Sequence, residues 1–254
     1  MIDRLGKLAI YLRSKRRFEV PVHKTGILMN SFSVALVTFL AFATYAGVAS
    51  AQAAESASPG TGGAKPMITL QMPPIPDPVA VTLKPASTAV LIFDVVEPIC
   101  ASRPKCRETM IPAIKGLLAR ARKAGVTVGY GTREPTMSKW MPEVAPQKGD
   151  VTVVSYGQDR FYNTDLDKLL KAKGVTTLIL TGWKISGSVL YTSVGATLRD
   201  YTVVIPLDAS LGPNDWEEVI GRYQILNQNS ANPTNQPLKE KTSTLSRTDL
   251  ITFQ

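Results

Sequence analysis

The sequence predicts an α/β domain, a three-layer sandwich around a mainly parallel sheet of about six strands. Short apolar runs rich in β-branched and aromatic residues alternate with longer segments whose apolar residues recur at helical spacing. The first run, residues 88–95 (TAVLIFDV), is apolar almost throughout, as expected for a strand covered on both faces. This alternation indicates a Rossmann-type parallel sheet with helices on both sides.

The first half of the domain contains three predicted strands and one long helix. The strand at 88–95 is followed by a helix that has Pro112 in its first turn and ends at Gly125. The apolar face of that helix consists of Met110, Ile114, Leu117, Leu118 and Ala121. The next two strands are predicted at residues 126–131 and 151–155.

The second half continues the same alternation. A capping-box pattern at residues 164–167 (TDLD) opens a short helix that ends at Gly174. A strand at 176–181 then leads into a helix from about residue 187 to 199. The remaining predicted elements are a strand at 201–206, a helix opened by Asn214 with Trp216, Val219, Ile220, Tyr223 and Leu226 on one face, and a last strand at 249–253.

The N-terminal residues have the pattern of an export signal. A basic stretch precedes an apolar run at residues 26–48, which ends in the small-residue sequences Ala49-Ser50-Ala51 and Ala51-Gln52-Ala53. We therefore expect residues 1–53 to be a signal peptide, and the protein to be periplasmic or secreted. A retained membrane anchor is the alternative, because about 20 apolar residues can span a bilayer. Met29 is an alternative start, although the peptide would then lose its positive flank.

Residues 54–86 are predicted to be a linker and an extended segment, because they are rich in Ser, Gly, Ala and Pro. The folded domain is then expected at residues 87–254.

The net charge of +9 does not indicate nucleic-acid binding, because much of it lies in the leader. Residues 1–51 hold seven of the 29 basic and two of the 20 acidic residues. This leaves 22 basic and 18 acidic residues, a net charge of +4, for the rest of the chain. Such a charge is typical of an ordinary solvated surface, and no basic stripe with interleaved aromatic residues is present.

The two cysteines, Cys100 and Cys106, lie beyond the export signal, where thiols are usually oxidised. A disulfide between them is the plain interpretation, and a reactive thiol or half of a metal site is the alternative. The single histidine, His23, lies in the leader, so a histidine-based zinc centre is excluded. We expect neither a metal nor a cofactor.

Several polar side chains stand where predicted strands end. In parallel α/β sheets the site lies at the carboxyl ends of the strands, so Asp94, Ser155 and residues 182–188 are expected to converge. Ser188 lies where a strand turns directly into a helix, and the free N–H groups of such a turn suit a developing oxyanion. The alternative is that Ser188 is only a helix-capping serine.

Three stretches of the sequence and Asp94 occur in an order and at a spacing that can be compared with a known family. These are residues 161–166 (FYNTDL), 178–182 (LILTG) and 186–189 (SGSV). In this order and spacing the chain resembles the isochorismatase-like cysteine hydrolases, and it is most similar to their N-carbamoylsarcosine amidase and nicotinamidase branches. The resemblance covers residues 86–210 well and the last 40 residues loosely.

The resemblance implies roles for several positions. An aspartate at Asp94 would be the general base, a lysine would stand at Ser155, and a nucleophilic cysteine would stand at Ser188. It also implies a cis peptide between Trp183 and Lys184, with the N–H groups of Lys184 and Ser188 forming an oxyanion hole. Two of the three implied catalytic side chains therefore differ, and a serine hydroxyl is a weaker nucleophile than a thiol.

Other residues are candidates for completing the site. Lys184 is predicted to supply an ammonium group, and its alternative is a solvent-facing position at the rim. Arg133, which follows the second strand, is a candidate for holding an anionic substrate. The other predicted substrate-binding residues are Trp140, Ser155, Tyr156, Trp183, Ser186 and Gly187.

Two functions follow from these residues. The first is a divergent hydrolase of a small amide, carbamoyl or vinyl-ether compound, with Asp94, Lys184 and Ser188 as its catalytic groups. The second is an exported pseudoenzyme that binds a small molecule without turnover, which the implied loss of the Lys and Cys favours. The expected partner is a small molecule. Contact with a membrane is expected only through an uncleaved leader, and a homo-oligomer remains open.

Overall fold

The computed structural model describes residues 69, 71–134, 139–228 and 230–254. The predicted signal peptide at residues 1–53 lies outside the described residues. Within the described part, every helix is too short or too polar to cross a lipid bilayer.

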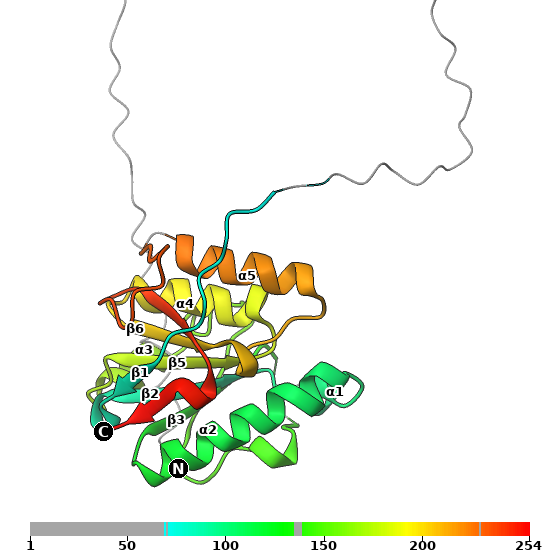
Figure 1. The fold of residues 1–254 in the computed structure, drawn as a ribbon. Helices are drawn as coiled ribbons and strands as arrows, with labels where there is room; N and C mark the ends of the chain where they lie inside the picture. Colours follow the sequence, from blue (N-terminus) through cyan, green and yellow to red (C-terminus); the bar gives the residue numbers. More distant parts are fainter. Residues whose placement is uncertain (1–68, 70, 135–138, 229) are drawn as a thin grey trace, which may run out of the picture. The chain divides into compact units, whose positions relative to one another are not determined.

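A six-stranded parallel sheet forms the centre of the domain, in the order β4-β3-β2-β5-β6-β7 (Figure 1). Its strands are β2 (Thr88–Phe93), β3 (Thr127–Thr132), β4 (Val151–Val154), β5 (Thr177–Gly182), β6 (Thr202–Pro206) and β7 (Ser243–Ser246). The predicted fold class is thus confirmed. The chain runs outward from β2 to β4 and then returns to the other side of β2, so the strand order reverses between β2 and β5.

The end of the chain differs from the prediction. The segment predicted as the last strand of the sheet, 249–253, instead contributes β8 (Ile251–Phe253), which pairs with β1 (Val81–Leu83) in a separate two-stranded sheet. The sixth strand of the main sheet is β7, which has the sequence STLS. Its serines and threonine are buried among hydrogen-bond partners rather than in an apolar run, so hydrophobic periodicity did not identify this strand.

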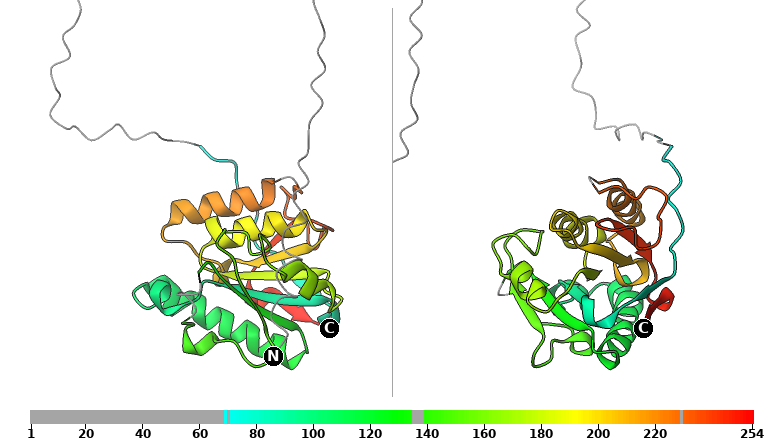
Figure 2. Two further views of the ribbon diagram at one scale, coloured as in Figure 1. Left: turned by 180° about the vertical axis from the view of Figure 1, so that it is seen from behind. Right: turned by 90° about the vertical axis from the view of Figure 1, so that its left-hand side faces the viewer.

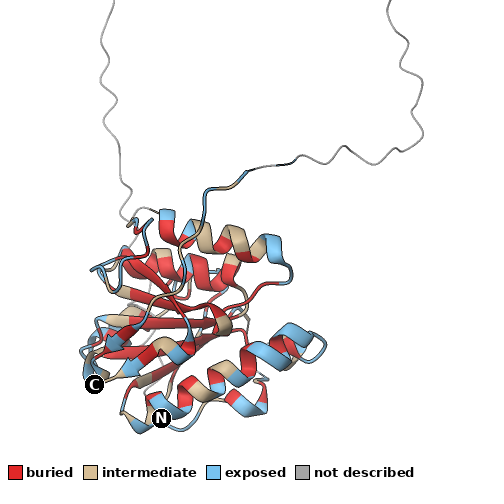
Figure 3. Cartoon of the chain, in the orientation of Figure 1, coloured by how far each residue is buried: buried red, intermediate tan, exposed pale blue. Residues whose placement is uncertain are grey.

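Helices cover both faces of the main sheet (Figures 1 and 2). The described α-helices are α1 (Glu97–Cys100), α2 (Ile111–Lys123), α3 (Leu166–Lys171), α4 (Leu190–Thr197) and α5 (Asp215–Asn227). Side chains alternate along β2, so Val90 and Ile92 pack with α2 while Leu91 and Phe93 pack with α3 and α4. The two resulting cores enclose a sheet whose central strand β2 is buried throughout (Figure 3).

The carboxyl ends of β2 and β5 lie unusually close together. Gly182 has a φ of +117°, and a Cβ atom there would lie 2.7 Å from Phe93 N and closer still to Phe93 O. Trp183 N–H donates to Phe93 O at 2.9 Å. The next residue after β2, Asp94, has a φ of +54°, and its N–H donates to Gly131 O at 3.1 Å. A non-glycine residue in this conformation is uncommon and often marks a functional site.

The predicted disulfide is present. Cys100 ends α1, Cys106 lies in the following π-helical segment Lys105–Met110, and both are fully buried. The bridge closes a short loop beside the end of β2.

The close approach at Gly182 leads to a stability prediction. Gly182→Ala should lower the free energy of unfolding by at least about 3 kcal/mol, because the new methyl group overlaps Phe93 and the backbone has a positive φ. Urea unfolding followed by circular dichroism would measure the change. Gly116→Ala is the matched control, because its Cβ would meet only an Arg120 side-chain atom at 3.8 Å, and it should be stabilising by up to about 1 kcal/mol. Equal stabilities of the two variants would contradict this account.

Candidate active site

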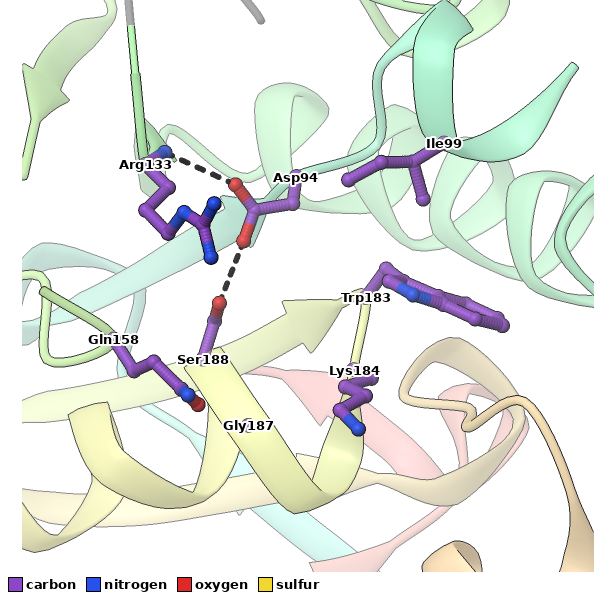
Figure 4. Close-up of a pocket in the computed structure, with 8 residues that line it drawn as sticks. All are labelled: Asp94, Ile99, Arg133, Gln158, Trp183, Lys184, Gly187 and Ser188. Carbon is purple, nitrogen blue, oxygen red and sulfur yellow. Dashed lines mark hydrogen bonds between the residues drawn. The ribbon is translucent and has the colours of Figure 1, made fainter. Parts of the chain in front are cut away.

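A cavity of about 210 Å³ opens where the strand order reverses, as expected for a parallel α/β sheet (Figure 4). Its walls come from the loops that follow β2, β3, β4 and β5. The lining residues are Asp94, Ile99, Arg133, Gln158, Trp183, Lys184, Gly187 and Ser188. Six of them are predicted site residues, so the structure brings together Asp94, Arg133 and the segment 183–188.

A direct hydrogen bond joins Asp94 and Ser188 across this cavity. Ser188 Oγ donates to Asp94 Oδ2 at 2.6 Å, and the backbone N–H of Arg133 donates to the other carboxylate oxygen at 3.2 Å (Figure 4). Both side chains are largely buried, with Asp94 5% and Ser188 7% exposed. Ser188 lies in the first helical turn, but its hydroxyl is bound to Asp94 and it is not the N-cap residue, which is Lys184.

The structure adds a residue that sequence reasoning missed. The guanidinium of Arg160 donates through one nitrogen, Nη2, to both Asp94 Oδ2 and Ser188 Oγ, the latter at 2.8 Å. Its other terminal nitrogen donates to the carbonyl oxygens of Gly157 at 2.7 Å and Ser155 at 3.3 Å. Arg160 is fully buried. Burial lowers the pKa of Arg160, and the Asp94 carboxylate opposes that shift.

The only signal for Arg160 in the sequence is its position next to residues that carry the resemblance. It directly precedes Phe161, the first residue of one of the three stretches on which the resemblance rests, in a segment otherwise read as a loop. No periodic pattern or motif marks a charged loop residue as buried. Its position became meaningful only when the loop was folded against β2 and α4.

Ser155 stands at the end of β4 but does not line the cavity. Its hydroxyl oxygen lies 2.9 Å from Asp159 O and 3.1 Å from Tyr162 O, so it holds the loop that carries Arg160. Ser155 therefore acts on the site only indirectly, by holding the loop from which Arg160 reaches Asp94 and Ser188.

Three further predicted residues also lie away from the cavity wall. Trp140 packs edge-on against Tyr130 with the ring centroids 5.0 Å apart. Tyr156 is 77% exposed. Ser186 turns toward α5, where its hydroxyl donates to Glu217 at 2.5 Å. These residues lie outside the site because their side chains point elsewhere, and the order of residues alone does not give that direction.

Lys184 lines the cavity, but its ammonium group is committed elsewhere. It forms an ion pair with Glu217 at the start of α5 and points away from the Asp94 carboxylate in Figure 4. The hydrogen bond from Lys184, with that from Ser186, lowers the pKa of Glu217. The positive charge nearest to Asp94 and Ser188 is consequently that of Arg160.

The turn between β5 and α4 contributes Trp183, Lys184, Gly187 and Ser188 to the cavity wall. The Trp183–Lys184 peptide is cis, as the resemblance implies. The Lys184 N–H has no hydrogen-bond acceptor within the described part of the chain. Gly187 breaks the helical geometry with φ −125° and ψ −111°, so the predicted helix is divided into a π-helical turn at Ile185–Val189 and the regular helix α4.

Among the described residues, no group of three His, Cys, Asp or Glu side chains lies close enough together to hold a metal ion. The polar side chains that line the cavity are those of Asp94, Ser188, Arg133, Gln158 and Lys184.

Comparison with known proteins identifies the class to which this fold and site belong. The model of the isochorismatase domain matches residues 88–228, which is more than half of the chain. The chain belongs to the isochorismatase family, as its resemblance implied.

Curated relatives match over a shorter part. Ureidoacrylate amidohydrolase RutB of Yersinia enterocolitica is 43% identical over 90 residues, which is 33% of this chain and 36% of that protein. The RutB protein of Stutzerimonas stutzeri is 34% identical over 88 residues, 35% of this chain and 32% of that protein. These alignments span only about a third of the curated relatives.

Solved structures of the same fold include members of both predicted branches. N-carbamoylsarcosine amidase from Thermoplasma acidophilum superimposes with a TM-score of 0.53 at 20% identity, covering 64% of this chain and 97% of that chain. The nicotinamidase of Staphylococcus aureus gives a TM-score of 0.51 at 15% identity, covering 57% and 98%. At these identities the likeness shows the fold.

The ion pair at the cavity rim predicts a pH-dependent contribution to stability. Because the pKa of Glu217 is lowered in the folded protein, its contribution is fully present above the ordinary glutamate pKa of about 4.3 and is lost as the pH falls from there through the lowered pKa of the folded state. Glu217→Gln should lower the melting temperature by about 2 °C at pH 7, since partly exposed pairs are weak. The difference should shrink as the pH falls below about 4.3.

Melting curves recorded between pH 3 and pH 7 would test this. Glu108→Gln, a change at an exposed glutamate of the segment Lys105–Met110, is the control and should behave like the unmodified protein. A difference for Glu217→Gln that persists unchanged at pH 3 would overturn the assignment.

Proposed function

We propose that this protein is a hydrolase of a small amide or carbamoyl compound that uses Ser188 as its nucleophile. The observation that supports the proposal is the hydrogen bond from Ser188 Oγ to Asp94 Oδ2, with Arg160 donating to both oxygens. A serine hydroxyl needs a base within hydrogen-bond reach, and Asp94 meets that requirement.

The reaction has two halves. As Ser188 Oγ bonds to the substrate carbonyl carbon, its proton passes to Asp94 and the carbonyl electron pair moves onto oxygen. The oxyanion is then held by the N–H groups of Lys184 and Ser188. The C–N bond breaks, and Asp94 returns the proton to the leaving nitrogen. Water next attacks the acyl carbon and gives its proton to Asp94, which passes it to the departing Ser188 oxygen.

The cavity limits the substrate to a small molecule. Its volume of about 210 Å³ is bounded by the apolar side chains of Ile99 and Trp183 on one side and by Arg133 and Gln158 on the other. A planar amide or ureido group with an adjoining polar substituent matches this combination. The sequence likeness to ureidoacrylate amidohydrolases supports the same choice.

There are two alternative functions. Hydrolysis of a vinyl ether such as isochorismate would need a protonated Asp94 to protonate the vinyl carbon and a water molecule to add to the resulting oxocarbenium ion before the C–O bond breaks, and it would not need the Ser188 nucleophile. A binding protein without turnover is supported by the three donors that already occupy the Asp94 carboxylate, from Arg133, Arg160 and Ser188. A carboxylate so fully hydrogen bonded can serve structure as well as chemistry.

Turnover assays separate these functions. The full-length protein would be incubated with nicotinamide, N-carbamoyl amino acids, hydrazides, ureidoacrylate and isochorismate, and the products would be measured by mass spectrometry. For an amide or carbamoyl substrate, Asp94→Asn and Ser188→Ala should each lower kcat/KM by about 100-fold or more, because each removes a reacting group. Loss in Asp94→Asn alone would indicate vinyl-ether hydrolysis.

Matched controls exist in the same chain. Asp200→Asn alters another ion-paired aspartate with a positive φ, and Ser193→Ala alters another buried serine, on α4. Both should leave turnover within about twofold. Thermal stabilisation by a compound of the panel without any product would refute the hydrolase and support the binding protein.

We also propose that residues 1–53 direct export to the periplasm or beyond the cell. The basic stretch, the apolar run and the Ala-Ser-Ala ending support this, and a disulfide in the folded domain fits an oxidising compartment. Mass spectrometry of the protein recovered from the periplasmic fraction should give a chain that begins near residue 52 or 54. Recovery of the intact chain from the membrane fraction would support the anchor, and recovery from the cytoplasm would contradict export.

A further inference from the structure

We infer that Arg160 supplies the positive charge that activates Ser188, from a position in the loop rather than at the end of β4. This inference rests on the proposed hydrolase function and assigns a residue that touches both reacting groups.

The contacts of Arg160 fit a role in activating an oxygen nucleophile. Its Nη2 donates to Ser188 Oγ at 2.8 Å while Ser188 donates its own proton to Asp94 Oδ2. When that proton moves to Asp94, the charge that develops on Oγ faces a cation already in hydrogen-bond contact. Fixed donors aimed at a developing charge act strongly in a buried site.

The surroundings hold the guanidinium in one place. Its backbone N–H donates to Thr192 on α4 at 3.1 Å, and its guanidinium lies 5.9 Å from the centre of the Phe93 ring. Gly131 leaves room for the stem, because a Cβ there would lie 2.9 Å from Arg160 Cδ. β3 therefore has a glycine where the arginine crosses it.

The other cations near the cavity are committed to other partners. Lys184 is paired with Glu217, and the Arg133 side chain, 53% exposed, is paired with Glu134. Among the described residues, Arg160 is the cation whose side chain contacts both Asp94 and Ser188.

The position of Arg160 also explains how a serine is accommodated at residue 155, where the resemblance implies a lysine. The Ser155 carbonyl accepts from Arg160 Nη1, and the Ser155 hydroxyl holds the loop between Asp159 and Tyr162. A short side chain at the end of β4 leaves the space between Asp94 and Ser188 to the guanidinium.

A thiol placed at position 188 measures this charge without any substrate. Ser188→Cys introduces a single free thiol, since the chain has two cysteines and both form the disulfide. The rate of alkylation by iodoacetamide, measured as a function of pH, reports the fraction of this thiol that is ionised. If Arg160 provides the charge, adding Arg160→Met to Ser188→Cys should move the titration midpoint up by about 1 to 3 pH units.

Arg199→Met combined with Ser188→Cys is the matched control. Arg199 lies near the same loop, 4.9 Å from the Phe161 ring and 3.9 Å from Asp159, but it does not contact Ser188. Its removal should leave the midpoint within about 0.3 units, because its charge is farther away and partly exposed. An unchanged midpoint in the Arg160→Met combination would overturn the inference.

A second variant covers the case in which Arg160→Met does not fold, as melting curves would reveal. Gly131→Ala keeps the arginine but forces its stem to shift, because the new Cβ would lie 2.9 Å from Arg160 Cδ. Combined with Ser188→Cys, it should also raise the midpoint, whereas a midpoint equal to that of Ser188→Cys alone would count against the role of Arg160.

Turnover separates this inference from the proposed function. If a substrate is found, Arg160→Ala should lower kcat by at least about 100-fold with KM little changed, and added guanidinium should restore part of the loss. Loss without rescue by guanidinium, together with an unshifted thiol titration, would leave only a structural role. If no substrate is turned over, the hydrolase fails while the thiol titration still decides the inference.

Discussion

A buried carboxylate and a buried guanidinium are stable in a protein when they pair and further hydrogen bonds compensate their charges. In the pair of Asp94 and Arg160, both carboxylate oxygens and both terminal guanidinium nitrogens are hydrogen bonded, with donors and acceptors from four separate loops, while Arg160 Nε has no partner in the described part of the chain. Removing either partner would leave an uncompensated charge among apolar side chains. The arrangement of the loops that follow β2, β3, β4 and β5 therefore depends on this one ion pair.

The backbone around the pair is shaped to permit it. Asp94 turns its carboxylate into the crevice through a positive φ, while Gly131 and Gly182 admit the arginine stem and the neighbouring strand end. The disulfide lies next to this turn and anchors the end of α1, where Cys100 directly follows the cavity-lining Ile99. On the opposite rim, Lys184 and Glu217 tie the β5–α4 turn to α5. Each device restrains a loop that carries one wall of the site.

A serine between a carboxylate and a guanidinium differs from a Ser-His-Asp triad, because one group accepts the proton and another supplies the positive charge. In a triad the histidine both accepts the proton and carries the resulting positive charge. Here the carboxylate of Asp94 is the proton acceptor, and the charge of Arg160 is present before the reaction begins. Such an arrangement does not require a titrating histidine, and the only histidine of this chain, His23, precedes the folded domain in the sequence.

The sequence by itself determined the layer architecture, the family and the strand ends at which Asp94 and Ser188 stand, because these depend on apolar periodicity and on the local order of residues. Tertiary structure alone decided which side chains enter the cavity. Ser155 and Ser186 turn to backbone and to Glu217, Lys184 is held by an acidic residue 33 positions away, and Arg160 reaches Asp94 across 66 positions. The physical reason is that a charged side chain in a loop takes its direction from distant partners and burial, neither of which leaves a periodic trace in the chain.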